Sequence, residues 1–312
     1  MNILLTNIGR RTYIVKYFEE LKKKYKLNIY LLDSSKFVPS FKVSKITKNF
    51  VSPRASSKEK YSKYLKNFVN KKKINLIFPL SNWEMSILAD LKNYFKKKNI
   101  EAIVSEKKVI KTCLNKLLTI KKLRTANLDY PKVINFNEIK KNLPVIKKRI
   151  IGRSSIDQEI ISSVKNISTS QKGFFYQKYL KFQEFGMDIL NDLNGNFLHC
   201  CVRKKLLMRA GDTDKAQIVK SKLFLNLAKK ISKTFKHIGI LDIDFLMNKN
   251  KIYILDLNPR IGGGYPFTHE FGYNYLEKII CLVLNKEYKI EKKIKKFNTN
   301  KIFTKGISIH RH

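Results

Sequence analysis

Short apolar runs alternate with amphipathic helical patterns through the first hundred residues. The apolar runs predict strands at 3–6, 28–32, 46–51, 74–79 and 102–104. The helical patterns lie at 11–24, 58–71 and 83–97. Strand–helix alternation of this kind predicts a parallel sheet covered on both faces, whose ligands gather at the carboxyl ends of its strands. Those ends carry the segments Asn7–Arg10, Asp33–Ser35 and Pro79–Asn82.

The pattern changes in the second half of the chain. Residues 106–143 predict two or three basic helices and a connection that contains Pro131. Longer strands of antiparallel character follow at 145–150, 174–179, 184–190, 196–204, 238–247 and 251–257, with a long helix at about 216–235 between them. We therefore expect an α/β part joined to an α+β part, with the boundary near Asn115 and domains at 1–114 and 115–312.

The charge of the chain is its most unusual compositional feature. There are 65 Lys and Arg residues against 24 Asp and Glu, a formal net charge of +41. Such an excess raises the question of a nucleic acid or an anionic membrane as partner. However, the lysines are spread over the whole length, accompany abundant Asn and Ile, and form runs at the ends of predicted helices. No aromatic–basic interleaving or helix-turn-helix signature accompanies them, so nucleic-acid binding is not expected.

Membrane insertion and secretion are also not expected. No window of eighteen apolar residues exists, and the N-terminus runs from apolar into basic, the reverse of a signal peptide. A cytoplasmic location follows as the expectation. The four cysteines have neither zinc-finger spacing nor the pattern of a disulfide framework, and we expect them to be reduced.

Acidic residues mark a predicted hairpin near residue 250. The strands 238–247 and 251–257 are separated by Asn248–Asn250, and a three-residue connection would place Asp244 opposite Asp256. Because side chains alternate along a strand, Asp256 and Asn258 share one face. Carboxylates that converge without a basic partner favour a hard cation, so we expect Mg²⁺, or Mn²⁺ in its place, with a nucleotide triphosphate completing the ligand shell.

The residues after this hairpin extend the same interpretation. Arg260 could hold phosphate oxygens, and Gly262–Gly264 allow the backbone to approach a ligand closely. For any single residue, a strand end that turns through Pro259 explains the sequence as simply. For the segment as a whole, with an acidic strand just upstream, we favour a site that binds a cation and phosphate.

The string Asp256–Gly263, DLNPRIGG, resembles the E/D-x-N-P-R-x-x-G signature of ATP-grasp enzymes, such as biotin carboxylase, D-alanine–D-alanine ligase and the carbamoyl-phosphate synthase large chain. Upstream, Leu143–Ser155 resembles the strand and phosphate-covering loop P-x-x-x-K-P-x-x-G-x-G-S of that family. The resemblance makes Lys148 a nucleotide lysine, with Lys147 as the alternative register. Arg149 and Ser154 replace the usual proline and glycine, which permits a non-catalytic nucleotide-binding protein.

Further ATP contacts follow from the same resemblance. Lys116 matches an earlier nucleotide lysine, and Glu184 fits the acid that grips the ribose hydroxyls. Phe174–Leu180 resembles the hinge that reads adenine. The implied ATP-binding set is Lys116, Lys148, Gly152, Ser154, Ser155, Gln177, Lys178, Tyr179, Leu180 and Glu184.

The resemblance also implies a domain plan and a reaction. Residues 5–15 and 77–84 are similar to a Rossmann-like pre-ATP-grasp domain, followed by a small lobe at about 115–180, a large lobe at about 181–290 and a basic tail. The implied metal ligands are Asp244, Asp256 and Asn258, the implied catalytic residues are Arg260 and Arg203, and the substrate-facing residues are Gly263, Gly264 and His269.

The activity implied is that of an ATP- and magnesium-dependent ligase. It would activate a small-molecule carboxylate as an acyl phosphate for capture by an amine and release ADP. A kinase-like phosphotransferase and a degenerate nucleotide-binding protein stay open as alternatives, with a basic nucleic-acid binder behind them. A homodimer is one option for the assembly.

Overall fold

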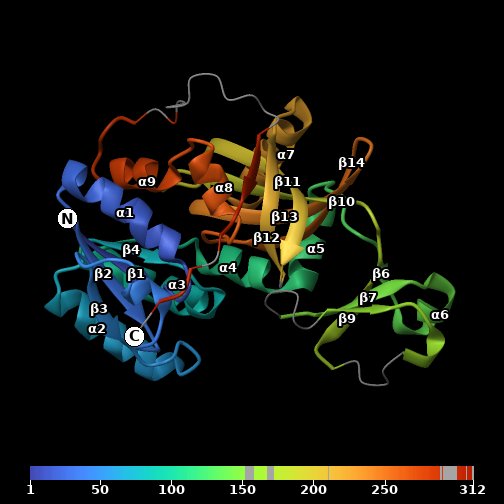
Figure 1. Ribbon diagram of the computed structural model, residues 1–312. Helices are drawn as coiled ribbons and strands as arrows, with labels where there is room; N and C mark the ends of the chain where they lie inside the picture. Colours follow the sequence, from blue (N-terminus) through green and yellow to red (C-terminus); the bar gives the residue numbers. More distant parts are fainter. Residues whose placement is uncertain are drawn as a thin grey trace.

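The computed structural model describes residues 1–151, 158–166, 172–209, 211–288, 290, 301–306 and 308–310. Within them the strands form an N-terminal sheet, a small sheet and a large sheet of five, four and six strands. Figure 1 shows the N-terminal sheet in blue at one side and the small sheet in green at the other. The large sheet, in yellow to red, lies between them. The expected combination of a parallel sheet with antiparallel sheets is confirmed.

The N-terminal sheet is entirely parallel, in the order β3-β2-β1-β4-β5. Its strands are β1 (Asn2–Thr6), β2 (Asn28–Asp33), β3 (Lys48–Val51), β4 (Leu76–Pro79) and β5 (Glu101–Ala102). The helices that connect them are α1 (Thr12–Tyr25), α2 (Lys58–Lys71) and α3 (Asn82–Lys97), with a 3-10 turn at Pro39–Phe41. Strand β4, next to the central strand β1, is buried along its whole length, as expected for a sheet that helices cover on both faces.

Two helices lead from the N-terminal sheet to the small sheet. They are α4 (Lys107–Leu114) and α5 (Lys116–Thr125), and Asn115 between them accepts hydrogen bonds from the first N–H groups of α5. Leu123 of α5 packs in the core of the large sheet. The small sheet is antiparallel and contains β6 (Val133–Ile134), β7 (Val145–Arg149), β8 (Glu159–Ile161) and β9 (Phe174–Lys178), with a short helix α6 (Ile139–Asn142).

The large sheet is antiparallel, in the order β14-β13-β10-β11-β12-β15. Its strands are β10 (Gln183–Asn191), β11 (Phe197–Arg209), β12 (Asp212–Val219), β13 (Gly239–Asn248), β14 (Lys251–Asn258) and β15 (Ile302–Thr304). The helices of this part are α7 (Lys222–Phe235), α8 (Tyr265–Glu270) and α9 (Tyr275–Val283).

The predicted start of the helix at about 216–235 is wrong by about one and a half turns, because α7 begins at Lys222. Residues 216–219 belong to β12, where Ala216 and Ile218 are buried and alternate with partly exposed neighbours. Helix α7 begins only after Ser221, whose side chain accepts a hydrogen bond from the N–H of Leu223 at 3.1 Å. The two-residue alternation and this N-cap outweigh the helical propensity of the segment.

The N-terminal domain packs directly on the helices that follow β14. One hydrophobic core joins β1 and α1 to α8 and α9. The ring of Tyr17 stacks on His269 with 3.5 Å between centroids, and its hydroxyl donates to Glu270 at 2.8 Å. Nζ of Lys24 lies 2.5 Å from Glu277. These contacts fix helix α1 of the N-terminal domain against α8 and α9.

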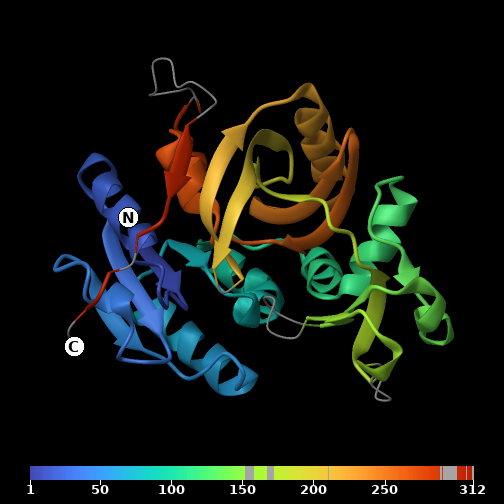
Figure 2. The same ribbon diagram turned by 45° about the vertical axis from the view of Figure 1, so that its right-hand side comes forward.

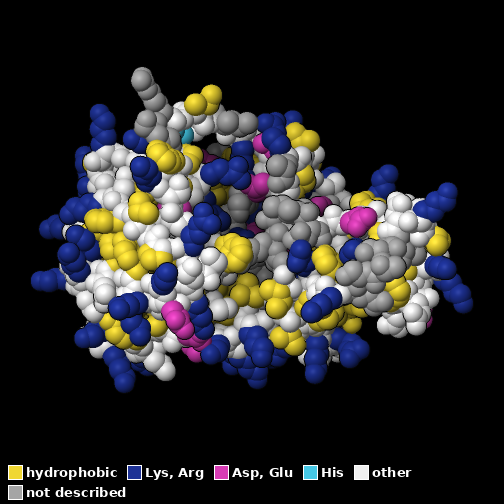
Figure 3. Space-filling view, turned by 90° about the horizontal axis from the view of Figure 1, so that it is seen from below, with side chains coloured by type: hydrophobic (Ala, Val, Ile, Leu, Met, Phe, Trp, Pro, Cys, Tyr) yellow, Lys and Arg dark blue, Asp and Glu magenta, His cyan; other side chains and the backbone are white. Residues whose placement is uncertain are grey.

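Basic side chains are scattered over the face of the molecule that Figure 3 shows. Lys and Arg form no dense patch on this face. Among the described helices, none is long and apolar enough to cross a bilayer.

Candidate functional site

The expected pairing of acidic strands is confirmed. Asp244 of β13 lies opposite Asp256 of β14, and Asp242 lies opposite Asn258. The hairpin turn is shorter than expected, because β13 ends at Asn248 and β14 begins at Lys251. A bulge next to Asp244 absorbs the difference and keeps the two carboxylates paired.

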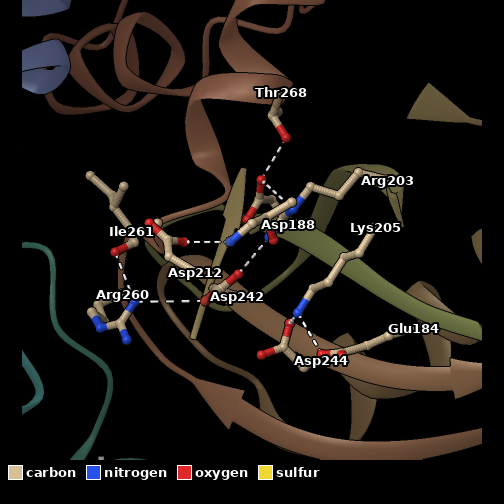
Figure 4. Close-up of polar contacts among 12 residues, drawn as sticks. Glu184, Asp188, Arg203, Lys205, Asp212, Asp242, Asp244, Arg260, Ile261 and Thr268 are labelled. Atoms are coloured by element: carbon tan, nitrogen blue, oxygen red, sulfur yellow. Dashed lines mark hydrogen bonds and ion pairs between the residues drawn. The ribbon is translucent and has the colours of Figure 1, made fainter. Parts of the chain in front are cut away.

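Lys205 of β11 joins two of the acidic residues. Its Nζ lies 2.6 Å from Asp244 and 2.7 Å from Glu184 (Figure 4). Burial disfavours its charged form, but the two carboxylates outweigh that effect and raise the pKa of Lys205. Burial acts on Asp244 in the opposite sense, yet Lys205 holds the pKa of that carboxyl below its ordinary value. The sequence offered Lys205 only as a neighbour of Arg203.

Lys116 and Lys148 approach the same acidic residues from the other side. Nζ of Lys116 lies 2.7 Å from Asp256, and its backbone N–H donates to the carbonyl of Ile150, just after β7, at 2.9 Å. Lys148 on β7 is only 4% exposed. Burial and the nearby charge of Lys116 lower the pKa of Lys148 to about 8, against the opposing effect of Asp256.

The position of Lys147 separates the two registers that the sequence left open. Its Nζ lies 4.7 Å from the centre of the Phe174 ring. Neighbouring residues of a strand point to opposite faces. Lys148 is therefore the residue that faces the acidic strands.

The carboxylates do have basic partners, contrary to the expectation from sequence. Among the described residues, no three His, Cys, Asp or Glu side chains converge as a metal cage. Mg²⁺ nevertheless needs only one or two protein carboxylates beside phosphate and water. Asp244 and Asp256 each hold an ammonium group at 2.6–2.7 Å with 31% of the side chain exposed, so their oxygens gather where a cation is favoured. The donor set fits the metal.

The predicted hinge lies at the end of β9. The side chain of Gln177 is 2% exposed and donates to the carbonyl of Pro131 at 2.9 Å. The N–H groups of Lys178 and Tyr179 donate to Lys132 and Pro144 at 2.8 and 3.2 Å. Because these donors are used within the small lobe, an adenine contact here falls to the carbonyl of Lys178 and the N–H of Leu180.

Arg203 lies deeper than the sequence suggested. Its side chain is 2% exposed, and its two terminal nitrogens contact Asp188 and Asp242 at 2.8 Å each (Figure 4). Two glycines surround it: a methyl group added to Gly186 or Gly264 would lie within 2.7 or 2.1 Å of the guanidinium. Arg203 is thus a buried anchor, although the resemblance implied that it is a catalytic residue.

The glycines after Arg260 also leave room for buried or neighbouring charged side chains. A methyl group on Gly262 would meet the carboxyl carbon of Asp242 at 2.1 Å, and one on Gly263 would meet Asp212 at 2.5 Å. The close approach expected for a ligand is made here by charged side chains of the protein. Nη1 of Arg260 itself lies 3.7 Å from Asp242.

A residue of the N-terminal domain completes this group. Asn82, at the start of α3, donates to Oδ1 of Asn258 and accepts from Nε of Arg260, both at 2.9 Å. The sequence had placed Asn82 at a strand end where ligands gather, but had given it no role.

His269 has a packing environment. It stacks on Tyr17 and lies 3.2 Å from the hydroxyl of Tyr265. Burial lowers its pKa to about 4. Gly152, Ser154 and Ser155 lie outside the described residues.

Comparison with known proteins places this geometry in context. A PylC-like N-terminal domain model matches residues 3–103, and an ATP-grasp domain model matches residues 113–264. No curated protein matches the sequence.

Several solved structures have a similar fold. N5-carboxyaminoimidazole ribonucleotide synthetase, solved as an ADP complex, is 13% identical with a TM-score of 0.71, over 92% of this chain and 77% of that one. Biotin carboxylase from Campylobacter jejuni is 15% identical with a TM-score of 0.73, over 92% and 72%. L-amino acid ligase from Bacillus licheniformis is 14% identical with a TM-score of 0.67, over 90% and 74%. At these identities the likeness shows the fold.

Proposed function

Because residues 113–264 match an ATP-grasp domain model, we propose that the chain is an ADP-forming ligase that activates a small-molecule carboxylate for capture by an amine. One observation carries the proposal. Lys116 at the start of α5 lies 2.7 Å from Asp256 of the large sheet. Lys148 of β7 is buried where the charges of Asp256, Glu184 and Asp244 all act on its pKa. Positive groups for phosphates and oxygen ligands for a cation therefore face each other.

The nucleotide is assigned to the space between the small and large sheets. Lys148 and Lys116 bind its phosphates, and Glu184 accepts hydrogen bonds from the ribose. The carbonyl of Lys178 and the N–H of Leu180 contact adenine. Lys205 is added to the phosphate-binding groups, because it is already charged and lies between Glu184 and Asp244.

Asp244, Asp256 and Asn258 would hold Mg²⁺, or Mn²⁺ in its place, and the cation would neutralise charge on the phosphates. The ammonium groups of Lys116 and Lys205 lie on these carboxylates in the present structure. They can move to the phosphates when nucleotide binds, so the acidic residues exchange one cation for another. Asn82 keeps Asn258 oriented throughout.

The chemistry needs no protein nucleophile. A carboxylate oxygen of the substrate bonds to the γ-phosphorus while the bond to the β–γ bridging oxygen breaks, and ADP leaves with that electron pair. Arg260 stabilises the negative charge on the transferred phosphoryl group. The amine then attacks the acyl carbon and displaces phosphate. Arg203 acts at a distance by holding Asp242, which contacts Arg260.

Small molecules are the partners that this site suits. The similar structures include an L-amino acid ligase and a biotin carboxylase, and the site here is likewise built for phosphate and carboxylate groups. The positive charge is scattered over the face that Figure 3 shows, so it favours no nucleic-acid interface there.

A panel of carboxylates and amines, incubated with ATP and Mg²⁺ while ADP release is followed, tests the proposal. Lys148→Ala and Asp256→Ala should each abolish ADP release with the substrates that support it. Lys147→Ala is the matched control and should retain activity, since Lys147 lies on the Phe174 ring. A stable phosphorylated product without amide would favour a kinase, and ATP binding without any turnover would favour a non-catalytic protein.

A further inference from the structure

The side chain of Lys305 reaches from the C-terminal segment into the large lobe. Strand β15, just before it, pairs with the edge strand β12 through three residue pairs only (Figure 2). The backbone N–H of Lys305 adds one hydrogen bond to the carbonyl of Asp214 at 2.9 Å. Phe303 of β15 also packs against the hydrophobic core, with its ring edge-on to Phe271 at 6.3 Å between centroids.

The ammonium group of Lys305 lies in a small cage. Its Nζ donates to the carbonyl of Gly263 at 2.7 Å and to Oδ2 of Asp212 at 3.0 Å. It also lies 5.4 Å from the centre of the Phe267 ring. A carboxylate, a carbonyl and an aromatic face are the groups that recognise a primary ammonium. We call Asp212, Gly263 and Phe267 the ammonium cage.

The ammonium cage borders the proposed reaction centre. Gly263 is three residues from Arg260, and Figure 4 shows Asp212 beside Arg260 and Ile261. Both charged groups also act on Tyr13 of the N-terminal domain. Burial raises the pKa of Tyr13 to about 12, Asp212 adds to the rise and Arg260 opposes it. Asp212 of the cage and Arg260 therefore both lie near Tyr13 of the N-terminal domain.

We propose that the ammonium cage is the subsite for the amino group of the acceptor, and that Lys305 fills it while no acceptor is bound. The role as acceptor subsite rests on the proposed ligase activity. The acceptor is then a primary amine that binds as its ammonium form. Lys305 shows which chemical group the cage binds. Its side chain is 22% exposed and that of Asp212 is 58% exposed, so the ammonium group can swing out to solvent while β15 stays in place.

The cage also supplies what the second half-reaction needs. Asp212 takes one proton from the bound ammonium and leaves a neutral amine. The nitrogen forms its bond to the acyl carbon as the bond between that carbon and the phosphate oxygen breaks. Phosphate leaves with the electron pair and carries away the second proton of the nitrogen.

The test uses n-butylammonium as the probe, with binding to the full chain followed by ligand-observed NMR without ATP. If Lys305 fills the cage in about nine-tenths of the molecules, Lys305→Ala should raise the apparent affinity about tenfold. Adding Asp212→Asn to that variant should weaken binding again, by about tenfold or more, because the carboxylate is removed. Lys301→Ala, in the same segment, should bind like the unsubstituted chain.

Equal affinity of Lys305→Ala and the unsubstituted chain would overturn the proposal, as would no effect of Asp212→Asn. With an amine that supports ADP release, Lys305→Ala should lower the KM for that amine and leave kcat nearly unchanged. Binding of n-butylammonium does not require turnover. If the protein binds this probe as expected but releases no ADP with any substrate, the ligase proposal is wrong and the binding site stands. If the protein releases ADP but Lys305→Ala binds amines no more tightly than the unsubstituted chain, the subsite is wrong and the ligase proposal stands.

Discussion

Asn82 of the N-terminal domain accepts a hydrogen bond from Nε of Arg260, 178 residues further along the chain, at 2.9 Å. The same side-chain amide donates to Oδ1 of Asn258 at 2.9 Å. One residue of the parallel-sheet domain thereby orients both a proposed metal ligand and the proposed phosphoryl-binding arginine. The N-terminal domain is part of the site and not only an attachment to it.

Asn82→Ala should lower kcat/KM for ADP release by about thirtyfold, since two hydrogen bonds of roughly 1 kcal/mol each orient groups in the site. Steady-state ADP release measures the change. Asn70→Ala is the matched control, because Asn70 donates to Tyr94 at 2.7 Å on the surface of the same domain. Equal activity of the two variants would show that Asn82 does not position the site.

Local patterns predicted part of this site, and the reason is geometric. Asp244 and Asp256 face each other because a short turn brings the two strands into near register and the bulge next to Asp244 supplies the one-residue shift that pairs them. Asn82 could not be assigned in this way, since its partners follow it by more than 170 residues.

The depth of a side chain is a second property that the sequence left open. Arg203 and Lys205 share one face of β11, and alternation alone does not distinguish them. The tertiary packing does, because Gly186 and Gly264 enclose Arg203 while Lys205 reaches Glu184 and Asp244. Strand β15 was missed because three residues carry too little pattern.

ATP binding should weaken as the pH rises through about 8. The pKa of Lys148 is lowered to about 8, so its ammonium form, which phosphates require, is complete below that pH and lost above it. Affinity should fall up to about tenfold between pH 7 and pH 9. Calorimetric titration with ATP over this range measures the effect.

Lys148→Arg provides the decisive comparison for this pH dependence. A guanidinium stays charged over the whole range, so the fall in affinity should flatten. Lys147→Ala should keep the pH dependence of the unsubstituted chain. An equally steep fall in Lys148→Arg would mean that another group titrates.

Gly264→Ala should destabilise the fold by about 1–3 kcal/mol through overpacking. The added methyl would lie 2.1 Å from the guanidinium carbon of Arg203, which two aspartates prevent from moving. Urea unfolding at constant pH measures the loss as a lower midpoint. Gly306→Ala is the control, because a methyl group there would meet none of the described residues within 4 Å. An unchanged midpoint in Gly264→Ala would mean that the side chain of Arg203 moves to make room for the added methyl group.

His237 should make the fold less stable in acid. Its side chain is fully buried, its Nε2 lies 3.3 Å from the carbonyl of Ile189, and burial lowers its pKa from 6.5 to about 3. Between these values the unfolded chain binds a proton that the folded chain does not. The stability that the buried, neutral imidazole of His237 contributes is therefore complete above pH 6.5 and declines as the pH falls toward 3. At pH 5 the loss is about 2 kcal/mol.

Urea unfolding of His237→Gln from pH 7 to pH 5 isolates this contribution. The variant should start less stable, because the contact to Ile189 changes, but its stability should decline less steeply with acid. His199 and His269, whose pKa values burial also lowers to about 4, keep part of the slope in every variant. His310→Gln near the C-terminus should retain the full slope. If His237→Gln and His310→Gln decline in parallel, the protonation of His237 does not limit stability in acid.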